Sequence, residues 1–270
     1  MTKIEEKFKE LAGKKETALI IGTVPGYPDL KTSFEIVKTI IGSGADILEL
    51  SSSFSDPIAD GPTLTHAHQK VLNSGITKKQ IFDCYKKITK TFDIPIFVIE
   101  YANIIYKIGL DKYFRQIKDC GIDTLIIPDI PLEELEPFYT SSQKNDVNLA
   151  LIITPTSPDE RIKLIEKKSK SFVYCILITG VTGAREAISP DTINFIKHAR
   201  KLVKLPLAVG FGISKPEHIR VLSKSGADGA VTCSKIINII DRNLRNRKDI
   251  QNELKRYVYS LKRATQSKNR

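Results

Sequence analysis

Apolar and polar positions follow two different periods along this chain, and segments of the two kinds alternate. Short, nearly continuous apolar runs are typical of buried strands, and each is followed by a longer run with the spacing of an amphipathic helix. Eight strand–helix units without a break in composition predict a (β/α)₈ barrel, in which helices cover a parallel sheet. The expected strands cover residues 18–24, 46–50, 94–101, 122–128, 149–153, 172–178, 206–210 and 229–232.

Several helix boundaries can be predicted in the same way. The helix expected over residues 29–43 has apolar positions at Phe34, Val37 and Ile41 and is closed by glycines. Another begins at Thr77, because Gln80 follows at the spacing of a capping box. Further helices are expected near residues 111, 132, 158, 190, 216 and 234, and the charged residues 1–11 predict an extra N-terminal amphipathic helix.

A doubly wound open sheet is the competing fold. It usually has fewer strands and a G-x-G-x-x-G turn after the first of them. The first turn here is Gly22-Thr23-Val24-Pro25-Gly26, which lacks that pattern. The length of 270 residues suits one barrel, so a single domain over 1–270 is expected.

The formal net charge of +11 is by itself compatible with nucleic-acid binding. The lysines are spread along the whole chain among acidic residues, however, so no nucleic-acid partner is expected. The one basic concentration, residues 241–270, has Ile250, Leu254, Val258 and Leu261 at helical spacing. It predicts a helix with one docked face and an end that frays over about residues 262–270.

The sequence also gives expectations about the cellular location of the protein and about metal binding. No apolar run approaches the roughly 20 residues that span a bilayer, and residues 1–11 contain no apolar signal segment. A cytoplasmic protein with no membrane partner is expected. The four cysteines are not spaced as a metal site, and His66 and His68 do not share a helix face, so we expect no metal.

The chemistry of such a barrel lies at the carboxyl ends of its strands. Because side chains alternate along a strand, Ile47 and Glu49 are expected to point into the barrel, and Leu48 and Leu50 towards the helices. A carboxyl group against an apolar wall has a raised pKa and can act as an acid. Pairing of Glu49 with a nearby lysine is the alternative, and the residues alone do not decide between the two.

Two further features lie in the loops after the strands. Residues 51–62 contain Asp56 and Asp60, although the commoner task of Asp in a loop is to cap a helix or form a turn. Glycine-rich segments at residues 180–185 and 210–214, together with Cys233-Ser234 at the start of a helix, predict a phosphate site.

Four segments in unbroken order carry a family resemblance: ADILELSSSFSDPIADGP (45–62), PTSPDER (155–161), ITGVTGAR (178–185) and AVGFGISKPEHI (208–219). They resemble tryptophan synthase α subunits, and the match runs from about residue 20 to residue 240. The resemblance implies a lyase of tryptophan biosynthesis, which cuts indole-3-glycerol phosphate into indole and glyceraldehyde 3-phosphate by a retro-aldol reaction.

The resemblance also implies roles for particular residues. Glu49 matches the general acid/base, and Asp60 matches the carboxylate that accepts the indole N–H. Asp56 matches a residue at the contact with the β subunit. Other matches are to substrate-binding residues: Tyr101 and Tyr174 in the pocket, Thr182 in the loop that closes over it, and Gly183, Phe211, Gly212 and Ser234 at the phosphate.

In that family the α subunit works in an α₂β₂ complex. The pyridoxal phosphate belongs to the β subunit, so this chain is expected to need no cofactor. The implied partners are therefore the β subunit and a small phosphorylated substrate.

The chain departs from the family pattern around the pocket and the partner surface. Gly22 stands where a bulky residue is usual, Tyr27 replaces an Asp, and Cys233 replaces a Gly beside the phosphate. Ser51 and Ser53 replace a Gly and a Pro, and Glu100 is a charge in an apolar strand, directed by alternation towards the helix layer. Two alternatives follow: a stand-alone barrel lyase for indole or another phosphorylated substrate, and a weakly catalytic activator of a β subunit.

Overall fold

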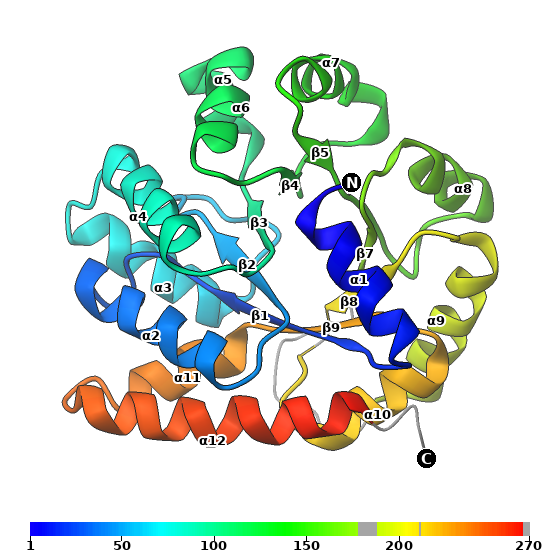
Figure 1. Ribbon diagram of the computed structural model, residues 1–270. Helices are drawn as coiled ribbons and strands as arrows, with labels where there is room; N and C mark the ends of the chain where they lie inside the picture. Colours follow the sequence, from blue (N-terminus) through cyan, green and yellow to red (C-terminus); the bar gives the residue numbers. More distant parts are fainter. Residues whose placement is uncertain (178–187, 211, 267–270) are drawn as a thin grey trace.

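The structure, a computed structural model, describes residues 1–177, 188–210 and 212–266 (Figure 1). Its strands form one parallel sheet in the order β5-β4-β3-β2-β1-β9-β8-β7-β6. Strand bounds follow the apolar runs of the sequence closely. They are β1 Ala18–Thr23, β2 Ile47–Ser51, β3 Ile96–Ile99, β4 Thr124–Ile126, β5 Asn148–Leu149, β6 Leu151–Ile153, β7 Val173–Ile176, β8 Leu207–Gly210 and β9 Gly229–Thr232.

The fifth predicted strand is divided in two at Ala150. β5 pairs with β4, and β6 pairs with β7, while the Ala150 N–H still donates to the carbonyl of Leu125 at 3.0 Å. The two ends of the strand order are thus consecutive in the chain. The sheet closes on itself at this residue, which confirms the predicted (β/α)₈ barrel.

Helices surround the strands, with α12 crossing α10, α11 and α2 on one side (Figure 1). The predicted caps at Asp29 and Thr77 are present, and Thr77 forms the full capping box with Gln80. The helix α3 and the short helix α5 were not expected. Helix bounds are α1 Lys3–Gly13, α2 Leu30–Gly42, α3 Pro62–Asn73, α4 Lys78–Thr91, α5 Ala102–Ile108, α6 Leu110–Asp119, η1 Leu132–Glu134, α7 Glu136–Lys144, α8 Asp159–Lys168, α9 Pro190–Leu202, α10 Pro216–Ser225, α11 Ser234–Arg242 and α12 Arg247–Thr265.

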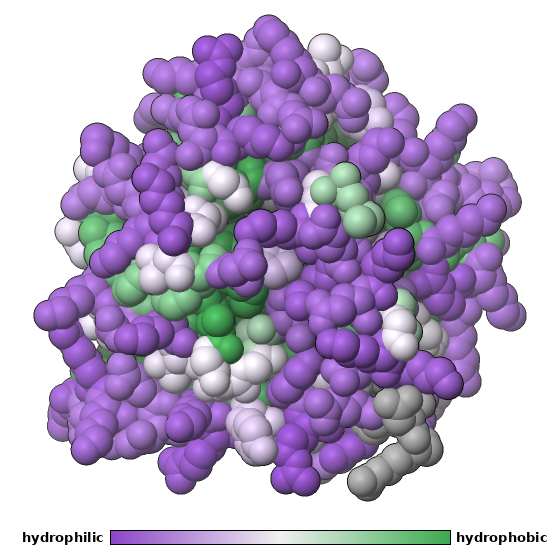
Figure 2. Space-filling model, viewed as in Figure 1, coloured by the Kyte–Doolittle hydropathy of each residue, from purple (hydrophilic) through white to green (hydrophobic). Residues whose placement is uncertain are grey.

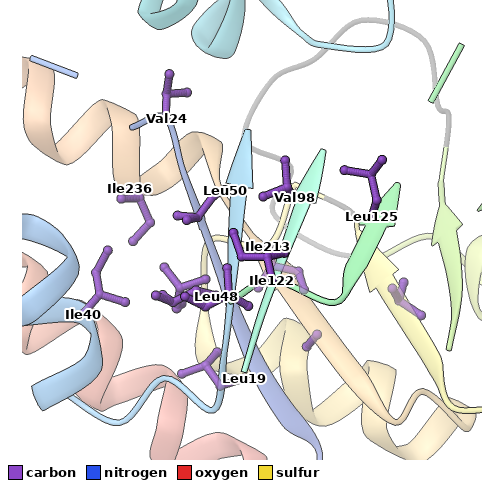
Figure 3. Packing of buried hydrophobic residues seen from close by; sticks show 14 of the residues in the cluster. Leu19, Val24, Ile40, Leu48, Leu50, Val98, Ile122, Leu125, Ile213 and Ile236 are labelled. Carbon is purple, nitrogen blue, oxygen red and sulfur yellow. The ribbon is translucent and has the colours of Figure 1, made fainter. Parts of the chain in front are cut away.

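Two separate apolar cores hold the barrel together. The outer core lies between strands and helices, where Leu48 and Leu50 of β2 face the helix layer near Ile40 and Ile236 (Figure 3). The inner core fills the barrel itself with the alternate residues of the strands. It also contains Ile4, Phe8 and Leu11, so the predicted N-terminal helix α1 closes the amino end of the barrel.

One predicted helix face needs correction. In α2 the apolar positions expected to be buried were Phe34, Val37 and Ile41, yet the fully buried ones are Ile36, Val37 and Ile40. Phe34 and Ile41 are only partly buried and pack at the edges of the outer core. The stripe that meets the sheet is centred on a different row of the same helix.

The predicted docked face of the C-terminal helix is confirmed, since Ile250, Leu254, Val258 and Leu261 are all buried. The expectation that the chain frays from about residue 262 is wrong as far as Thr265. Lys262 Nζ lies 2.8 Å from a carboxylate oxygen of Asp46, directly before β2, and 3.4 Å from one of Glu16, two residues before β1. The Thr17 N–H donates to the carbonyl of Thr265 at 3.2 Å, so the last turn is anchored to the barrel.

The face on which α1 lies is mostly hydrophilic, with hydrophobic side chains visible only between polar ones (Figure 2). Within the described residues no helix is long and apolar enough to cross a membrane. Over the same ranges no group of three or more His, Cys, Asp and Glu side chains is placed to hold a metal ion.

Candidate active site

A cavity of about 350 Å³ opens at the carboxyl ends of the strands, opposite the end that α1 closes. Its wall is largely apolar because inward-pointing residues of successive strands face one another across it. Carboxylate and hydroxyl groups enter this wall from β2, from the loop after it, from Tyr101 just after β3, and from β7. The apolar part is formed by Ile99, Ile126, Ile152, Ile176, Leu177, Ile213 and Val231.

Glu49 points into the barrel as its strand position predicts, while Leu48 and Leu50 lie in the outer core. Only 3% of it is exposed, and its carboxylate accepts a hydrogen bond from the Tyr174 hydroxyl at 2.8 Å. Burial, reinforced by the negative charge of Asp60, raises the pKa of Glu49 from 4.5 to about 7, although the bond from Tyr174 opposes the rise. The lysine partner left open by the sequence is not found among the described residues.

Asp60 reaches the cavity from the loop between β2 and α3. Its Oδ2 accepts a hydrogen bond from the Tyr101 hydroxyl at 2.8 Å, and that hydroxyl accepts one from the Ala59 N–H at 3.2 Å. The Tyr101 ring also stacks on Phe54 with centroids 5.1 Å apart. Asp60 does not cap α3, whose N-cap is Gly61 with no side-chain cap bond. One tyrosine therefore holds both the loop and its carboxylate.

His68 is a site residue that the sequence analysis missed. It is fully buried on α3, and its Nε2 lies 3.2 Å from Asp60 Oδ2, outside hydrogen-bond geometry. Neither ring nitrogen has a hydrogen-bond partner among the described residues. A helix starting at Pro62 would have revealed it, because Leu64, His68 and Val71 recur at helical spacing on its buried face.

The described part of the predicted phosphate site, Gly212 and Ser234, lies at one edge of the cavity. Gly212 and Ser234 line it, and α11 begins at Ser234, so the N–H groups of Ser234 and Lys235 precede the first intrahelical bonds of Ile236 and Ile237. Lys235 and Asn238, one helical turn apart, also line the cavity and were not predicted. The position of Lys235 could have been noticed in the sequence. A lysine in the first turn of a helix is unfavourable to the helix dipole, so its presence there indicates another role.

Asp56 is exposed and lies apart from the cavity, on the outer part of the same loop that carries Asp60. Ser55 donates to its carboxylate at 2.5 Å, and its carbonyl accepts from the Ile58 N–H at 2.9 Å. Ile58 is 80% exposed, which is unusual for a large apolar side chain in a loop. The tip of this loop therefore presents an acid and an apolar residue side by side.

Tyr27, which stands where the family pattern has an Asp, is buried and does not line the cavity. Its hydroxyl donates to the carboxylate of Asp241 in α11. Burial, together with that carboxylate, raises the pKa of Tyr27 well above its usual range. The residue ties the turn after β1 to the helix whose first turn borders the cavity.

Comparison with known proteins shows the family of the chain. The sequence profile described as "Tryptophan synthase alpha chain" matches residues 8–266. The chain belongs to the tryptophan synthase alpha chain family. A tryptophan synthase alpha chain from Thermoanaerobacter pseudethanolicus is 42% identical over 262 residues, covering 97% of this chain and 99% of its own. One from Methanocaldococcus jannaschii is 39% identical over 254 residues, covering 94% and 90% respectively.

A solved structure of the tryptophan synthase α₂β₂ complex from Pyrococcus furiosus is similar to this chain with a TM-score of 0.85 and 31% identity. The match covers 91% of this chain and 98% of the Pyrococcus furiosus chain. Membership of the tryptophan synthase alpha family gives the chain the role of an α subunit in tryptophan biosynthesis, and makes it an enzyme of the lyase kind.

The residues expected to form a tryptophan synthase alpha site fall into three groups. The cavity brings together six of them, whereas Asp56 lies on the outer loop surface. Thr182, Gly183 and Phe211 lie outside the described residues, so their roles stay predictions. The six that line the cavity are Glu49, Asp60, Tyr101, Tyr174, Gly212 and Ser234.

Proposed function

We propose that this chain cleaves indole-3-glycerol phosphate into indole and glyceraldehyde 3-phosphate. The observation that carries the proposal is the contrast between Glu49 and Asp60. Glu49 is buried, with a pKa raised to about 7, and can both give and take a proton near neutral pH. Asp60 is held at the cavity by hydrogen bonds from a tyrosine and faces the same apolar space.

The proposed reaction uses only proton transfers and one bond cleavage. The Glu49 carboxyl gives its proton to the indole ring carbon that bears the glycerol chain. Asp60 accepts the indole N–H and stabilises the positive charge that develops on the ring. The Glu49 carboxylate then takes the proton of the adjacent glycerol hydroxyl as the carbon–carbon bond breaks. Indole and an aldehyde leave, and Glu49 is protonated again.

The cavity has places for both ends of this substrate. Its isoleucine-rich wall suits an indole ring, since apolar surface removed from water stabilises a complex by about 25 cal/mol per Å². Gly212, Ser234 and the first turn of α11 form an edge suited to a phosphate, and Lys235 adds a cation there. Since the reaction needs no redox step or electron sink, the proposed chemistry requires no cofactor in this chain.

A β subunit is the proposed partner, and pyridoxal phosphate is assigned to that subunit. The Pyrococcus furiosus relative is described in an α₂β₂ complex. In this chain the exposed Asp56 and Ile58 lie on the loop that continues inward to Asp60. A partner that covers the tip of the loop would thereby act on the position of the Asp60 carboxylate.

The decisive experiment follows indole release from indole-3-glycerol phosphate by the purified chain, alone and with a β subunit from the same source. Release that rises strongly with the β subunit supports the proposed lyase in a complex. Release that is fast alone and unchanged by the partner supports the stand-alone lyase instead. If the folded chain releases no indole in either case, the proposed reaction is wrong.

A further inference from the structure

A second carboxylate is buried behind the wall of the cavity. Glu100 follows β3 directly and is 1% exposed. Its neighbours Ile99 and Tyr101 line the cavity, whereas Glu100 points the other way, to the helix layer, as the alternation predicts. Figure 1 shows α4 and α6 on that outer side of β3. The carboxylate therefore faces neither solvent nor substrate.

Three donors from different elements surround Glu100. Lys78 Nζ, at the start of α4, donates at 3.2 Å, and the Tyr113 hydroxyl of α6 donates at 3.1 Å. The backbone N–H of Tyr101 donates at 3.3 Å. Burying a charge is costly unless it is both paired and hydrogen-bonded, and here it is.

Lys78 does more than neutralise Glu100. Its Nζ also donates to the Ser52 hydroxyl at 2.5 Å and to the Ser53 carbonyl at 3.4 Å. Both belong to the loop after β2, in the stretch where Ser51 and Ser53 replace a glycine and a proline of the family pattern. The Ser51 and Ser53 hydroxyls are buried without a hydrogen-bond partner among the described residues, so they do not fix this stretch.

Both ends of the loop that carries Asp60 are thus tied to one carboxylate. The start of the loop is held through Lys78, which bridges Ser52 and Ser53 to Glu100. The end is held through Tyr101, whose backbone binds Glu100 and whose hydroxyl binds Asp60 and Ala59. A lysine in the first turn of α4 opposes the helix dipole, so α4 itself gains nothing from this placement.

We propose that Lys78 and Glu100 are positioning residues for the lyase reaction, which brace the loop over residues 51–60 so that Asp60 meets the indole N–H. This inference rests on the proposed function. A misplacement of about 1 Å in a reacting group can cost about 100-fold in rate. The brace therefore controls turnover more than substrate binding.

The test compares Lys78→Met with Lys79→Met. Lys79 is the matched control, because it is next to Lys78 on α4 but is exposed and pairs with Asp83 on the surface. With each protein folded, we expect Lys78→Met to lower kcat roughly ten-fold or more with KM within about two-fold, and Lys79→Met to leave both unchanged. Lys78→Arg, which keeps the cation, should recover most of the loss.

A second comparison separates positioning from general stability. In a protein that already carries Asp60→Asn, adding Lys78→Met should lower kcat little further, because the effect of Lys78 on kcat passes through the Asp60 carboxylate. An equal loss in both backgrounds would overturn the proposal, as would a kcat for Lys78→Met equal to the wild type. If Lys78→Met fails to fold, Glu100→Gln takes its place in both comparisons, with the same expected results. That substitution keeps the shape of the side chain and removes its charge. Indole release by the wild type distinguishes failure of the brace from failure of the proposed reaction.

Discussion

The Cys233 side chain fills the space that a side chain at Gly22 would need. A Cβ at position 22 would lie 2.7 Å from Cys233 Cβ and 2.9 Å from its Sγ. It would also lie 2.7 Å from Glu49 Oε1, because Gly22 and Glu49 are partners in neighbouring strands. The two departures from the family pattern are therefore one compensated arrangement, in which the thiol packs over β1 beside the acid.

We expect Gly22→Ala to disturb both neighbours. The added methyl displaces the Cys233 side chain and the Glu49 carboxylate, so the free energy of unfolding should fall by about 1–3 kcal/mol and kcat should fall with it. Urea unfolding and indole release measure the two effects.

Adding Cys233→Gly to Gly22→Ala is the matched control. It removes the contacts with the thiol but not the contact with Glu49 Oε1. Stability should recover further than kcat does. Equal recovery of the two would mean that the methyl does not reach Glu49.

Glu49→Gln should lower turnover strongly and leave ligand binding nearly unchanged. The amide keeps the shape of the carboxyl but cannot transfer the proton, so kcat should fall by about 10²–10⁴-fold. Affinity for glycerol 3-phosphate, measured by calorimetry, should stay within about two-fold, because we expect its phosphate to bind at the edge formed by Gly212 and Ser234 rather than at the Glu49 carboxyl. Retained turnover would remove Glu49 from the reaction.

The same substitution should change how stability depends on pH. The pKa of Glu49 is about 7 in the folded chain and about 4.5 in the unfolded chain, so the folded chain binds this proton more tightly. The free energy of unfolding therefore falls as the pH rises from about 4.5 to about 7. Glu49→Gln avoids that loss. It should be more stable than the wild type by on the order of 3 kcal/mol at pH 8, with little difference near pH 4.5. Urea unfolding at both pH values tests the sign.

Tyr174→Phe should move the pH profile of the reaction. The Tyr174 hydroxyl stabilises the ionised Glu49, so its removal raises the pKa of Glu49 above about 7. Because the free enzyme must hold the proton on Glu49, kcat/KM should fall on the alkaline side, and in the variant this fall should begin at higher pH. If the alkaline fall of kcat/KM occurs at the same pH in the variant and the wild type, then it is caused by the titration of a group other than Glu49.

Asp60 and Asp56 lie on one loop, but their substitutions should affect indole release differently. Asp60→Asn removes the negative charge that faces the indole, so kcat should fall by about 100-fold with or without a β subunit. Asp56→Asn should leave indole release by the chain alone within about two-fold, yet weaken its rise on addition of the β subunit. Indole release across a titration of β subunit separates the two. Identical behaviour of the variants would contradict the separate roles.

Much of the site could be predicted from the chain because it depends on local rules. The apolar runs fixed the number and order of strand–helix units, and period-two alternation directed Glu49 into the barrel and Glu100 away from it. A role for Asp60 was predicted only from the resemblance of residues 45–62 to the family, not from a local rule. Capping signals at Asp29 and Thr77 placed two helix starts within one residue.

Contacts between distant segments could not be predicted in this way. Lys78 beside Glu100, His68 beside Asp60 and Cys233 over Gly22 all depend on the register of neighbouring strands and on where loops fold back. The division of the fifth strand at Ala150 follows from closure of the sheet, and the ordered end of α12 follows from ion pairs with Asp46 and Glu16.

The physical reason is the range over which each kind of information acts. Periodicity and capping report which way a side chain points within its own element. Which group it meets is decided only when the barrel closes and the helices settle on it. The sequence by itself therefore determined the fold and pointed to the two carboxylates, while the tertiary structure decided the surroundings of Glu49 and the partners of both carboxylates.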